Sequence, residues 1–398
     1  MKKTFFIITA GCLRRKLDSQ RHENLFEKNG WKSESRPENA DLIVLSSCNF
    51  SNDQEETSIM MLKDILKKIK KGSKLIVTGC TAGFRETLFK KGINSEDIDI
   101  ITSEEEFDLI IEKRKCLEQI PDCNEFKVRR LSFAFSMKSL FNPVSVWRKY
   151  RKLWCIKSFI NHNFFPKKYF YLRLGNGCLG NCSYCIIKRS IGSLKSKPVD
   201  VIIDEFKMGI KSGYSEFILL GDDTGAYGRD IGATLTELID KITSYEGRYK
   251  LHIIELNINW FVKMREEFSM LINRGKIKGI HFCLQSGSEN ILKLMNRYSD
   301  INKIRESLIN LNRDFPDLRK SVDLIQGFPG ETEKDFEETT DLIKKSGFKD
   351  VWLFPYSERS QTPACSLPGK VKNEVIHDRI KRFYKIVRCN NLYFPFYR

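Results

Sequence analysis

Residues 176–188 read NGCLGNCSYCIIK and place three cysteines, Cys178, Cys182 and Cys185, within eight positions. Zinc sites and electron-transfer iron–sulfur sites normally take four protein ligands. Half a zinc site completed from elsewhere is one interpretation, but the sequence offers no histidine pair and no second CxxC for the completion. Three thiolates on a four-iron cubane instead leave one iron free to bind a small molecule. The spacing therefore predicts an iron–sulfur cluster with one reactive iron.

This loop follows the first of six strand candidates in residues 169–365. Helix-like stretches separate the six runs, so the alternation predicts six βα units and a partial barrel that is open on one side. The chemistry of such barrels lies at the carboxyl ends of the strands, which is where the loop falls. The glycine-rich GFPGET (327–332) lacks the Lys-Ser/Thr of a phosphate loop and is predicted to be a turn. The six runs are YFYLRLG (169–175), EFILLGDD (216–223), KLHIIELNI (250–258), GIHFCLQSG (279–287), SVDLIQGFP (321–329) and DVWLFPYS (350–357).

Residues 1–112 repeat a strand followed by a helix-like stretch and end on a fourth strand, DIDIITS (97–103). This pattern predicts a small parallel α/β domain. Each of the first three strands ends in a cysteine, namely Cys12, Cys48 and Cys80. Because the carboxyl ends of parallel strands share one edge of a sheet, we expect these cysteines to converge as a second site with three thiols. The alternative is that buried cysteines happen to end three strands.

The net charge of +17 over 398 residues favours an anionic partner. Most of the excess lies in residues 113–168, which carry fourteen Lys or Arg against three Asp or Glu, interleaved with aromatic residues such as Trp147 and Trp154. This segment is predicted to be a basic aromatic linker that docks RNA or an acidic peptide. A solvated linker without a partner is the alternative. Residues 366–398 are predicted to form a C-terminal helix and tail.

The N-terminus, MKKTFFIITAGC, imitates a lipoprotein signal, but its apolar run from Phe5 to Ala10 is shorter than the usual signal core. Without export, twelve cysteines indicate reduced thiols in the cytosol, where clustered cysteines point to metal binding. The longest apolar runs are the size of strands and too short to span a membrane. We therefore expect a cytoplasmic protein with no membrane partner.

The cysteine loop, its place after the first barrel strand and Tyr184 before its last cysteine resemble the radical S-adenosylmethionine (radical SAM) enzymes. The strand ends AGC, SSC and TGC, with Asp18–Ser19, are similar to the N-terminal domain of the methylthiotransferases within that group. Four later blocks are also similar: DDTGAYGRD (222–230), LQSGSENILKLMNR (284–297), DLIQGFPGETEKDFEET (323–339) and FPYSERSQTPA (354–364). The resemblance implies a small parallel α/β N-terminal domain followed by a partial (β/α)6 radical SAM barrel.

The resemblance also implies the cofactors, SAM and two 4Fe–4S clusters, and a reductant such as flavodoxin or ferredoxin. Cys178, Cys182 and Cys185 would hold the cluster that cleaves SAM to a 5′-deoxyadenosyl radical. Cys12, Cys48 and Cys80 would hold an auxiliary cluster on which sulfur is methylated by one SAM before transfer to a carbon radical made with a second. The other SAM-binding residues would be Tyr184 through its backbone, Gly221 and Asp222 beside the methionine amine, and Glu255, Gln285 and Ser286 at strand ends. Polar residues that only cap the barrel mouth are the alternative for this last group.

The chain departs from the family pattern at Ser46, Ile191 and Gln361, and it ends near where family members begin a small β-barrel that recruits tRNA or a ribosomal protein. The expected reaction replaces an unactivated C–H with C–SCH3. The expected substrate is a peptide or protein side chain, such as an aspartate β-carbon or an acidic precursor of a ribosomally made natural product, because DDTGAYGRD is closest to members that modify aspartate. A tRNA adenosine is the first alternative. Others are a radical SAM peptide-modifying enzyme whose auxiliary cluster only relays electrons, and an iron–sulfur sensor or scaffold.

Overall fold

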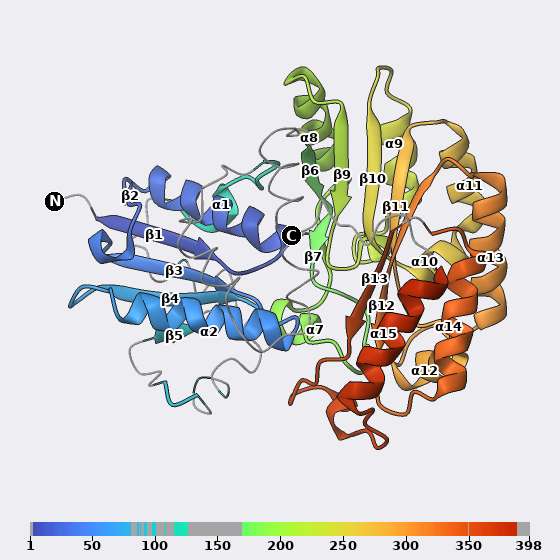
Figure 1. The fold of residues 1–398 in the computed structure, drawn as a ribbon. Helices are drawn as coiled ribbons and strands as arrows, with labels where there is room; N and C mark the ends of the chain where they lie inside the picture. The colour runs from blue at the N-terminus through green and yellow to red at the C-terminus, as the bar shows by residue number, and fades with distance from the viewer. Residues whose placement is uncertain are drawn as a thin grey trace. The chain divides into compact units, whose positions relative to one another are not determined.

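The structure is a computed structural model that describes residues 3–80, 86, 88, 91–93, 98–100, 108, 115–125, 169–348 and 350–387. These residues form two compact units, each built on its own parallel sheet (Figure 1). The first sheet contains β1 to β5 and the second contains β6 and β9 to β13. Both sheets confirm the predicted parallel α/β class.

The first sheet has the strand order β2-β1-β3-β4-β5, with every neighbouring pair parallel. All six positions of β3 are buried, as its near-continuous apolar run predicts for a parallel strand covered on both faces. Only the two-residue edge strand β2 was not expected from the sequence. The elements are β1 Thr4–Thr9, α1 Leu13–Lys28, β2 Lys32–Ser33, η1 Pro37–Asn39, β3 Leu42–Ser47, α2 Asn52–Leu66, β4 Lys74–Gly79, β5 Ile98–Ile100 and η2 Leu117–Gln119.

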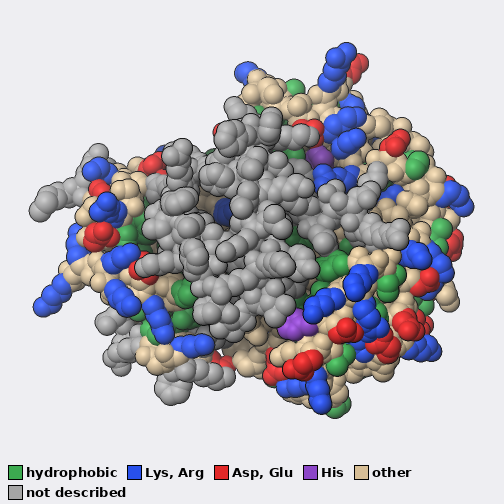
Figure 2. Space-filling view, in the orientation of Figure 1, with side chains coloured by type: hydrophobic (Ala, Val, Ile, Leu, Met, Phe, Trp, Pro, Cys, Tyr) green, Lys and Arg blue, Asp and Glu red, His purple; other side chains and the backbone are tan. Residues whose placement is uncertain are grey.

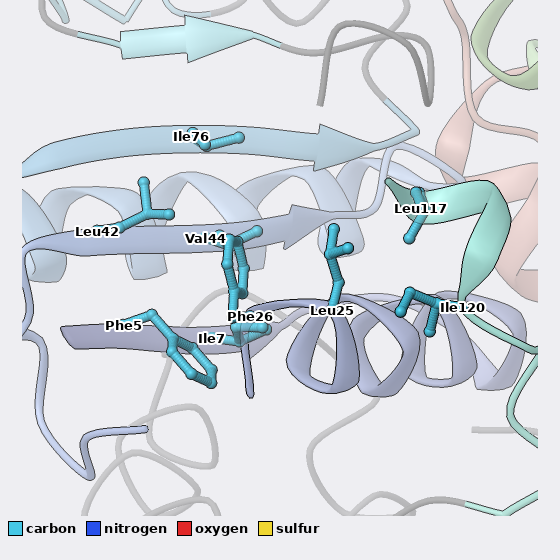
Figure 3. Packing of buried hydrophobic residues seen from close by; sticks show 9 residues of the cluster. All are labelled: Phe5, Ile7, Leu25, Phe26, Leu42, Val44, Ile76, Leu117 and Ile120. Carbon is cyan, nitrogen blue, oxygen red and sulfur yellow. The ribbon is translucent and has the colours of Figure 1, made fainter. Parts of the chain in front are cut away.

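One face of this sheet packs against α1 through a cluster of aromatic and aliphatic side chains (Figure 3). Leu117 and Ile120, which fall in the predicted linker, are fully part of this cluster. Arg21 of α1 fixes them further, because its guanidinium donates to the carbonyl oxygens of Leu117 at 2.8 Å and Ile120 at 2.9 Å. The first unit therefore extends beyond the predicted boundary at residue 112. The rest of the basic segment, residues 113–114 and 126–168, lies outside the described residues.

The second sheet has the strand order β13-β12-β11-β10-β9-β6, and all its pairs are parallel. Each of the six predicted barrel strands is present, and Figure 1 shows α9, α11, α13 and α14 along one side of the sheet. The strands are β6 Phe170–Arg173, β9 Glu216–Leu220, β10 Lys250–Asn257, β11 Ile277–Gln285, β12 Arg319–Gln326 and β13 Asp350–Pro355, with a separate hairpin of β7 Gly175–Asn176 and β8 Lys195–Ser196. The helices are α7 Ile187–Ile191, α8 Val199–Lys211, η3 Thr224–Ala226, α9 Leu235–Thr243, α10 Ile258–Lys263, α11 Arg265–Asn273, α12 Glu289–Leu294, α13 Ile301–Asp314, α14 Glu333–Lys345, η4 Pro363–Ser366 and α15 Asn373–Val387.

Two barrel strands are irregular near their carboxyl ends. The register of β10 against β11 shifts between Ile253 and Leu256, and that of β11 against β12 shifts between Cys283 and Gln285. Within these shifts Glu255 and Gln285 take left-handed backbone conformations, with φ of 56° and 78°. Such bulges change the direction in which a side chain points relative to a regular strand. Both residues were predicted to be part of the site.

The GFPGET segment is a turn between β12 and α14, as predicted, and it is tied to α15 by a buried ion pair. Glu331 Oε2 accepts hydrogen bonds from the backbone N–H of Gly327 at 2.8 Å and from Arg379 Nη1 at 2.9 Å. The side chains of Glu331 and Arg379 are only 2% and 6% exposed. The predicted C-terminal helix is thereby anchored to the end of β12.

On the face shown in Figure 2, Lys and Arg side chains of the described residues are scattered among Asp and Glu side chains. The concentrated charge of the sequence is thus a property of residues 113–168, most of which are not described. Among the helices of the described residues, none combines the length and the apolar character needed to cross a membrane.

Candidate functional site

The three-cysteine loop lies between β7 and α7 and is held by residues from distant parts of the second unit. The backbone N–H of Gly177 donates to Asp222 Oδ2 at 2.9 Å, just after β9. Ser183 donates through its N–H to the carbonyl oxygen of Met295 at 2.9 Å and accepts at its own carbonyl from Ala364 N–H at 2.8 Å. These contacts hold the loop at Gly177 and at Ser183, near the carboxyl edge of the sheet.

The loop sulfurs have the surroundings of metal ligands. A Cβ built on Gly180 would lie 3.2 Å from Cys178 Sγ and 3.9 Å from Cys182 Sγ, so both sulfurs border the same small space. Backbone N–H groups donate to sulfur at two positions, from Gly180 to Cys178 at 3.1 Å and from Ile187 to Cys185 at 3.4 Å. Such donors stabilise thiolates, and three thiols are the number that a cubane with one open iron needs. The residues present therefore fit a 4Fe–4S cluster.

Without a bound metal, the thiols of Cys178 and Cys185 hold their protons. Burial and, to a lesser extent, the nearby Asp223 carboxylate raise the pKa of Cys178 to about 12. Burial likewise raises the pKa of Cys185 to about 11. A metal that binds thiolates must displace these protons, so cluster assembly at this loop releases protons.

Two adjacent aspartates after β9 have different surroundings. Asp222 holds the loop through Gly177, as described above. Asp223 is 6% exposed, and its Oδ2 lies 3.3 Å from Trp260 Nε1 and 3.7 Å from Cys178 Sγ. Its other oxygen, Oδ1, is buried and has no hydrogen-bond partner in the part of the chain that the structure describes. Burial raises the pKa of Asp223, so this oxygen is suited to a ligand that brings a hydrogen-bond donor.

Arg297 joins the loop to two barrel strands. Its Nη1 lies 3.3 Å from Cys182 Sγ and 3.3 Å from the Tyr184 hydroxyl. Its Nη2 donates to Asn257 Oδ1 at 2.7 Å and to the carbonyl oxygen of Cys283. A partly buried guanidinium therefore lies directly beside a predicted cluster ligand.

The other predicted SAM-binding residues make different kinds of contact in the structure. Tyr184 packs in a buried cluster with Met295, Phe328 and Ala364, which leaves its backbone at the loop. The Ser286 hydroxyl lies 3.2 Å from the hydroxyl of Thr339 on α14, which favours a structural role. The Glu255 carboxylate accepts a hydrogen bond from the Cys283 thiol at 3.2 Å.

Gly221 and Gln285 complete this set. A Cβ at Gly221 would meet only ordinary contacts of 3.6 Å and longer, so packing does not require glycine there. Gln285 is 9% exposed and follows Cys283 across the bulge at the end of β11.

Cys12, Cys48 and Cys80 follow neighbouring strands of the first sheet. Cys12 comes after β1 and immediately precedes α1, while Cys48 and Cys80 directly follow the last residues of β3 and β4. Those last residues, Ser47 and Gly79, are register partners. Gly79 has φ of 95°, and a Cβ there would lie 2.6 Å from the carbonyl oxygen of Ser47, so only glycine permits this close approach.

The order of the strands adds to this placement. The chain enters the sheet at β1, moves outward to β2 and then crosses to β3, so the direction of winding reverses between β1 and β3. Ligands of open α/β sheets bind at the carboxyl ends of strands at such a reversal. Cys12 and Cys48 flank that point, and the amino terminus of α1 beside Cys12 favours an anionic ligand.

Sequence reasoning missed four residues of the loop site: Asp223, Asn257, Trp260 and Arg297. Two of them lie within blocks that are similar to the methylthiotransferases, Asp223 in DDTGAYGRD and Arg297 at the end of LQSGSENILKLMNR. Their residue types, a second carboxylate beside Asp222 and a lone arginine, are the features of the sequence that could have indicated a role in the site. Asn257 and Trp260 carried no signal in the sequence.

Two family models match the chain. The radical SAM superfamily matches residues 172–343, and the Uncharacterized protein family UPF0004 matches residues 4–102. The first covers the cysteine loop and most of the six-stranded sheet. The second covers the sheet that carries Cys12, Cys48 and Cys80.

Curated relatives match nearly the whole chain. A probable threonylcarbamoyladenosine tRNA methylthiotransferase of Pyrococcus horikoshii is 30% identical over 96% of this chain and 85% of its own length. A tRNA-2-methylthio-N(6)-dimethylallyladenosine synthase of Clostridium botulinum is 30% identical over 96% and 81%. The ribosomal protein uS12 methylthiotransferase RimO of Carboxydothermus hydrogenoformans is 28% identical over 96% and 82%.

Among solved structures, the radical SAM methyltransferase TsrM of Kitasatospora setae is similar with a TM-score of 0.58 at 12% identity, over 92% of this chain and 75% of that one. This likeness confirms the predicted fold. The family models and relatives confirm the transferase class and the predicted cofactors, SAM and two 4Fe–4S clusters. With 30% identity to a curated methylthiotransferase over 96% of its length, the chain belongs to the radical SAM methylthiotransferase family.

Proposed function

We propose that this enzyme attaches a methylthio group to an N6-modified adenosine of tRNA. Two of the three relatives described above are named for tRNA adenosines, and this observation carries the proposal. The net charge of +17 supports it, because phosphate contacts dominate the binding of nucleic acids. The peptide substrate preferred from the sequence becomes the second candidate.

The peptide candidate keeps two supporting observations. One relative is named for ribosomal protein uS12. The DDTGAYGRD block is also similar to that of family members that modify aspartate. Product analysis distinguishes the two substrate classes.

We assign the cofactor ligands as the sequence predicted them. Cys178, Cys182 and Cys185 would hold the SAM-cleaving cluster, and Cys12, Cys48 and Cys80 the auxiliary cluster. When bound, these groups supply the electron that breaks a C–S bond of SAM and the site at which sulfur is methylated. The geometry of the loop and the placement of the strand ends support both assignments.

The polypeptide's own part is to orient SAM and to exclude water. Asp223, rather than the predicted Asp222, would accept hydrogen bonds from the methionine amine, because its buried Oδ1 is free of partners among the described residues whereas Asp222 holds Gly177. Trp260 would keep Asp223 in place through its Nε1–H. Tyr184 backbone, Gly221 and Gln285 remain proposed contacts of SAM, while Ser286 would act by holding the strand end.

The test is a product assay under anaerobic conditions with reconstituted enzyme, SAM and a reductant. One arm offers bulk tRNA from cells that lack methylthioadenosine, and the other offers uS12 and acidic precursor peptides. We expect methylthioadenosine in digested tRNA, together with deoxyadenosine and S-adenosylhomocysteine. A methylthiolated peptide with unmodified tRNA would establish the second candidate instead. Deoxyadenosine without S-adenosylhomocysteine in both arms would count against methylthiolation itself.

A further inference from the structure

Four potential metal ligands meet inside the second sheet, on three neighbouring strands. Glu255 belongs to β10, His281 and Cys283 to β11, and Asp323 to β12. One ligand atom from each lies within 4.8 Å of those of all the others. The predicted cluster ligands and Asp223 take no part in this group, whereas Glu255, which the resemblance assigned to the SAM pocket, belongs to it.

The backbone explains why these side chains share one face. His281 and Cys283 are two positions apart on one strand, so they point to the same side. Phe282 between them points to the other side, where its ring lies 5.1 Å from that of Phe261. Cys283 and Asp323 are register partners. The left-handed conformation of Glu255 brings its carboxylate to the Cys283 thiol at 3.2 Å.

The histidine is oriented as a metal ligand would be. Its Nδ1 lies 2.9 Å from Ser321 Oγ, and its Nε2 lies 3.2 Å from Asp323 Oδ2. A metal-bound imidazole usually has such a second partner, which fixes the tautomer and the plane of the ring. The His281 side chain is 3% exposed and that of Asp323 is 17% exposed, so solvent contacts the group at Asp323.

Asp323 also has an unused oxygen. Its Oδ1 is buried and finds no hydrogen-bond partner among the residues that the structure describes. A buried carboxylate oxygen without a partner costs free energy unless a ligand completes it.

We propose that Glu255, His281, Cys283 and Asp323 form a site for one Zn²⁺ ion. One sulfur, one imidazole nitrogen and two carboxylate oxygens suit zinc in tetrahedral geometry, whereas calcium and magnesium prefer oxygen ligands alone. Two ligand pairs already lie 3.2 Å apart, close to the spacing at a tetrahedral ion.

The charges balance when zinc binds. Cys283 loses its proton to solvent, so two carboxylates and one thiolate carry three negative charges. The ion contributes two positive charges, and the third comes from Arg297, whose guanidinium donates to the carbonyl oxygen of Cys283. The site is thus neutral when filled. This inference does not rest on the proposed substrate.

The experiment measures metal content of the anaerobically reconstituted full-length enzyme. The enzyme is equilibrated with a small excess of Zn²⁺ and desalted, and zinc and iron are then measured together. We expect about one zinc per chain in addition to the cluster iron. His281→Gln and Asp323→Asn should each lose this zinc while the iron content stays unchanged.

Two control variants remove the same chemical groups elsewhere in the unit. His252→Gln removes a histidine whose Nε2 lies 2.6 Å from Glu216, and Cys365→Ser removes a thiol that donates to Glu358 at 3.3 Å. Both should keep the zinc, as should the wild type. Retention of zinc by His281→Gln and Asp323→Asn, or a wild type without zinc, would overturn the proposal. If the wild type holds no zinc and His281→Gln and Asp323→Asn change the affinity for SAM, the group belongs to the SAM pocket instead.

A variant that fails to fold is recognised by its iron content and circular dichroism. In that case the thermal midpoint of Cys283→Ser serves as the second measurement. Added Zn²⁺ should raise the midpoint of the wild type and of Cys365→Ser but not that of Cys283→Ser, because binding to the folded state alone stabilises it. An equal rise in all three proteins would contradict the assignment.

Discussion

The guanidinium of Arg297 lies 3.3 Å from the sulfur of Cys182, although 115 positions separate the two residues in the chain. A cation that donates to a cluster ligand stabilises the more negative, reduced state of the cluster. We predict that Arg297→Gln lowers the midpoint potential of the SAM-cleaving cluster by about 60 mV, the equivalent of a tenfold change for one electron. Titration followed by electron paramagnetic resonance measures this potential, and Arg297→Lys should recover part of it. Equal potentials in all three proteins would show that Arg297 has only a structural role.

Replacing Cys178, Cys182 and Cys185 together by alanine should lower the iron content from about eight to about four atoms per chain, because one cubane of four irons loses its ligands. Reductive cleavage of SAM should be abolished. Iron analysis and the yield of deoxyadenosine measure the two effects. A triple variant that retains both clusters would show that the ligands are elsewhere.

The companion variant replaces Cys12, Cys48 and Cys80 by alanine. It should also retain about four irons, but it should still form deoxyadenosine, because the loop proposed to hold the SAM-cleaving cluster is intact. Transfer of a methyl group to sulfur should disappear. Mass spectrometry of the product decides the point, and a methylthiolated product from this variant would exclude the auxiliary role of the strand-end cysteines.

Arg379→Met leaves the buried Glu331 carboxylate without its ion-pair partner. At a pH well above the pKa of Glu331, where its carboxyl is ionised, we expect a loss of about 3 kcal/mol in the free energy of unfolding, the usual cost of stranding a buried charge. Urea unfolding followed by tryptophan fluorescence measures it. The double variant Glu331→Gln, Arg379→Met should recover most of the loss, since it removes both charges. If the double variant is as unstable as the single one, lost packing rather than the stranded charge is the cause.

Glu331 also predicts a dependence of stability on pH. Burial raises its pKa from 4.5 to about 7, despite the opposing effects of the Gly327 N–H and Arg379. The folded chain therefore holds this proton over a range in which the unfolded chain has lost it. The free energy of unfolding should fall by about 2–3 kcal/mol as pH rises from about 4.5 to about 7, and the contribution should be constant above that. Glu331→Gln should remove this part of the pH dependence, and an unchanged profile would contradict it.

Much of the fold could be predicted because its signals are local. The apolar runs of β3 and β11 and the cysteines that follow strands can be read within a few residues of sequence. The two-residue strand β2 and the bulge at Glu255 could not, because two residues show no periodicity and a bulge depends on the neighbouring strand. The end of the first unit was placed too early because Leu117 and Ile120 reach its core from a basic segment.

The candidate site divides in the same way. The spacing of the loop cysteines identifies them in the sequence. Arg297, by contrast, lies beside the loop only in the folded chain, and its neighbours in sequence give no indication of its contacts with Cys182 and Asn257. Asp222 and Asp223 are adjacent and identical in type, so only their different burial and partners distinguish them. Long-range contacts of this kind have no signature in a single sequence.

The left-handed backbone of Glu255 and Gln285 has a consequence for the thermal stability of the enzyme. Each residue costs about 1 kcal/mol or more relative to glycine, which adopts this conformation without strain. Glycine at either position is therefore the obvious substitution for heat tolerance. Glycine at position 255 would also remove the carboxylate that accepts the hydrogen bond from the Cys283 thiol, so stability and the proposed metal site place opposite demands on this residue.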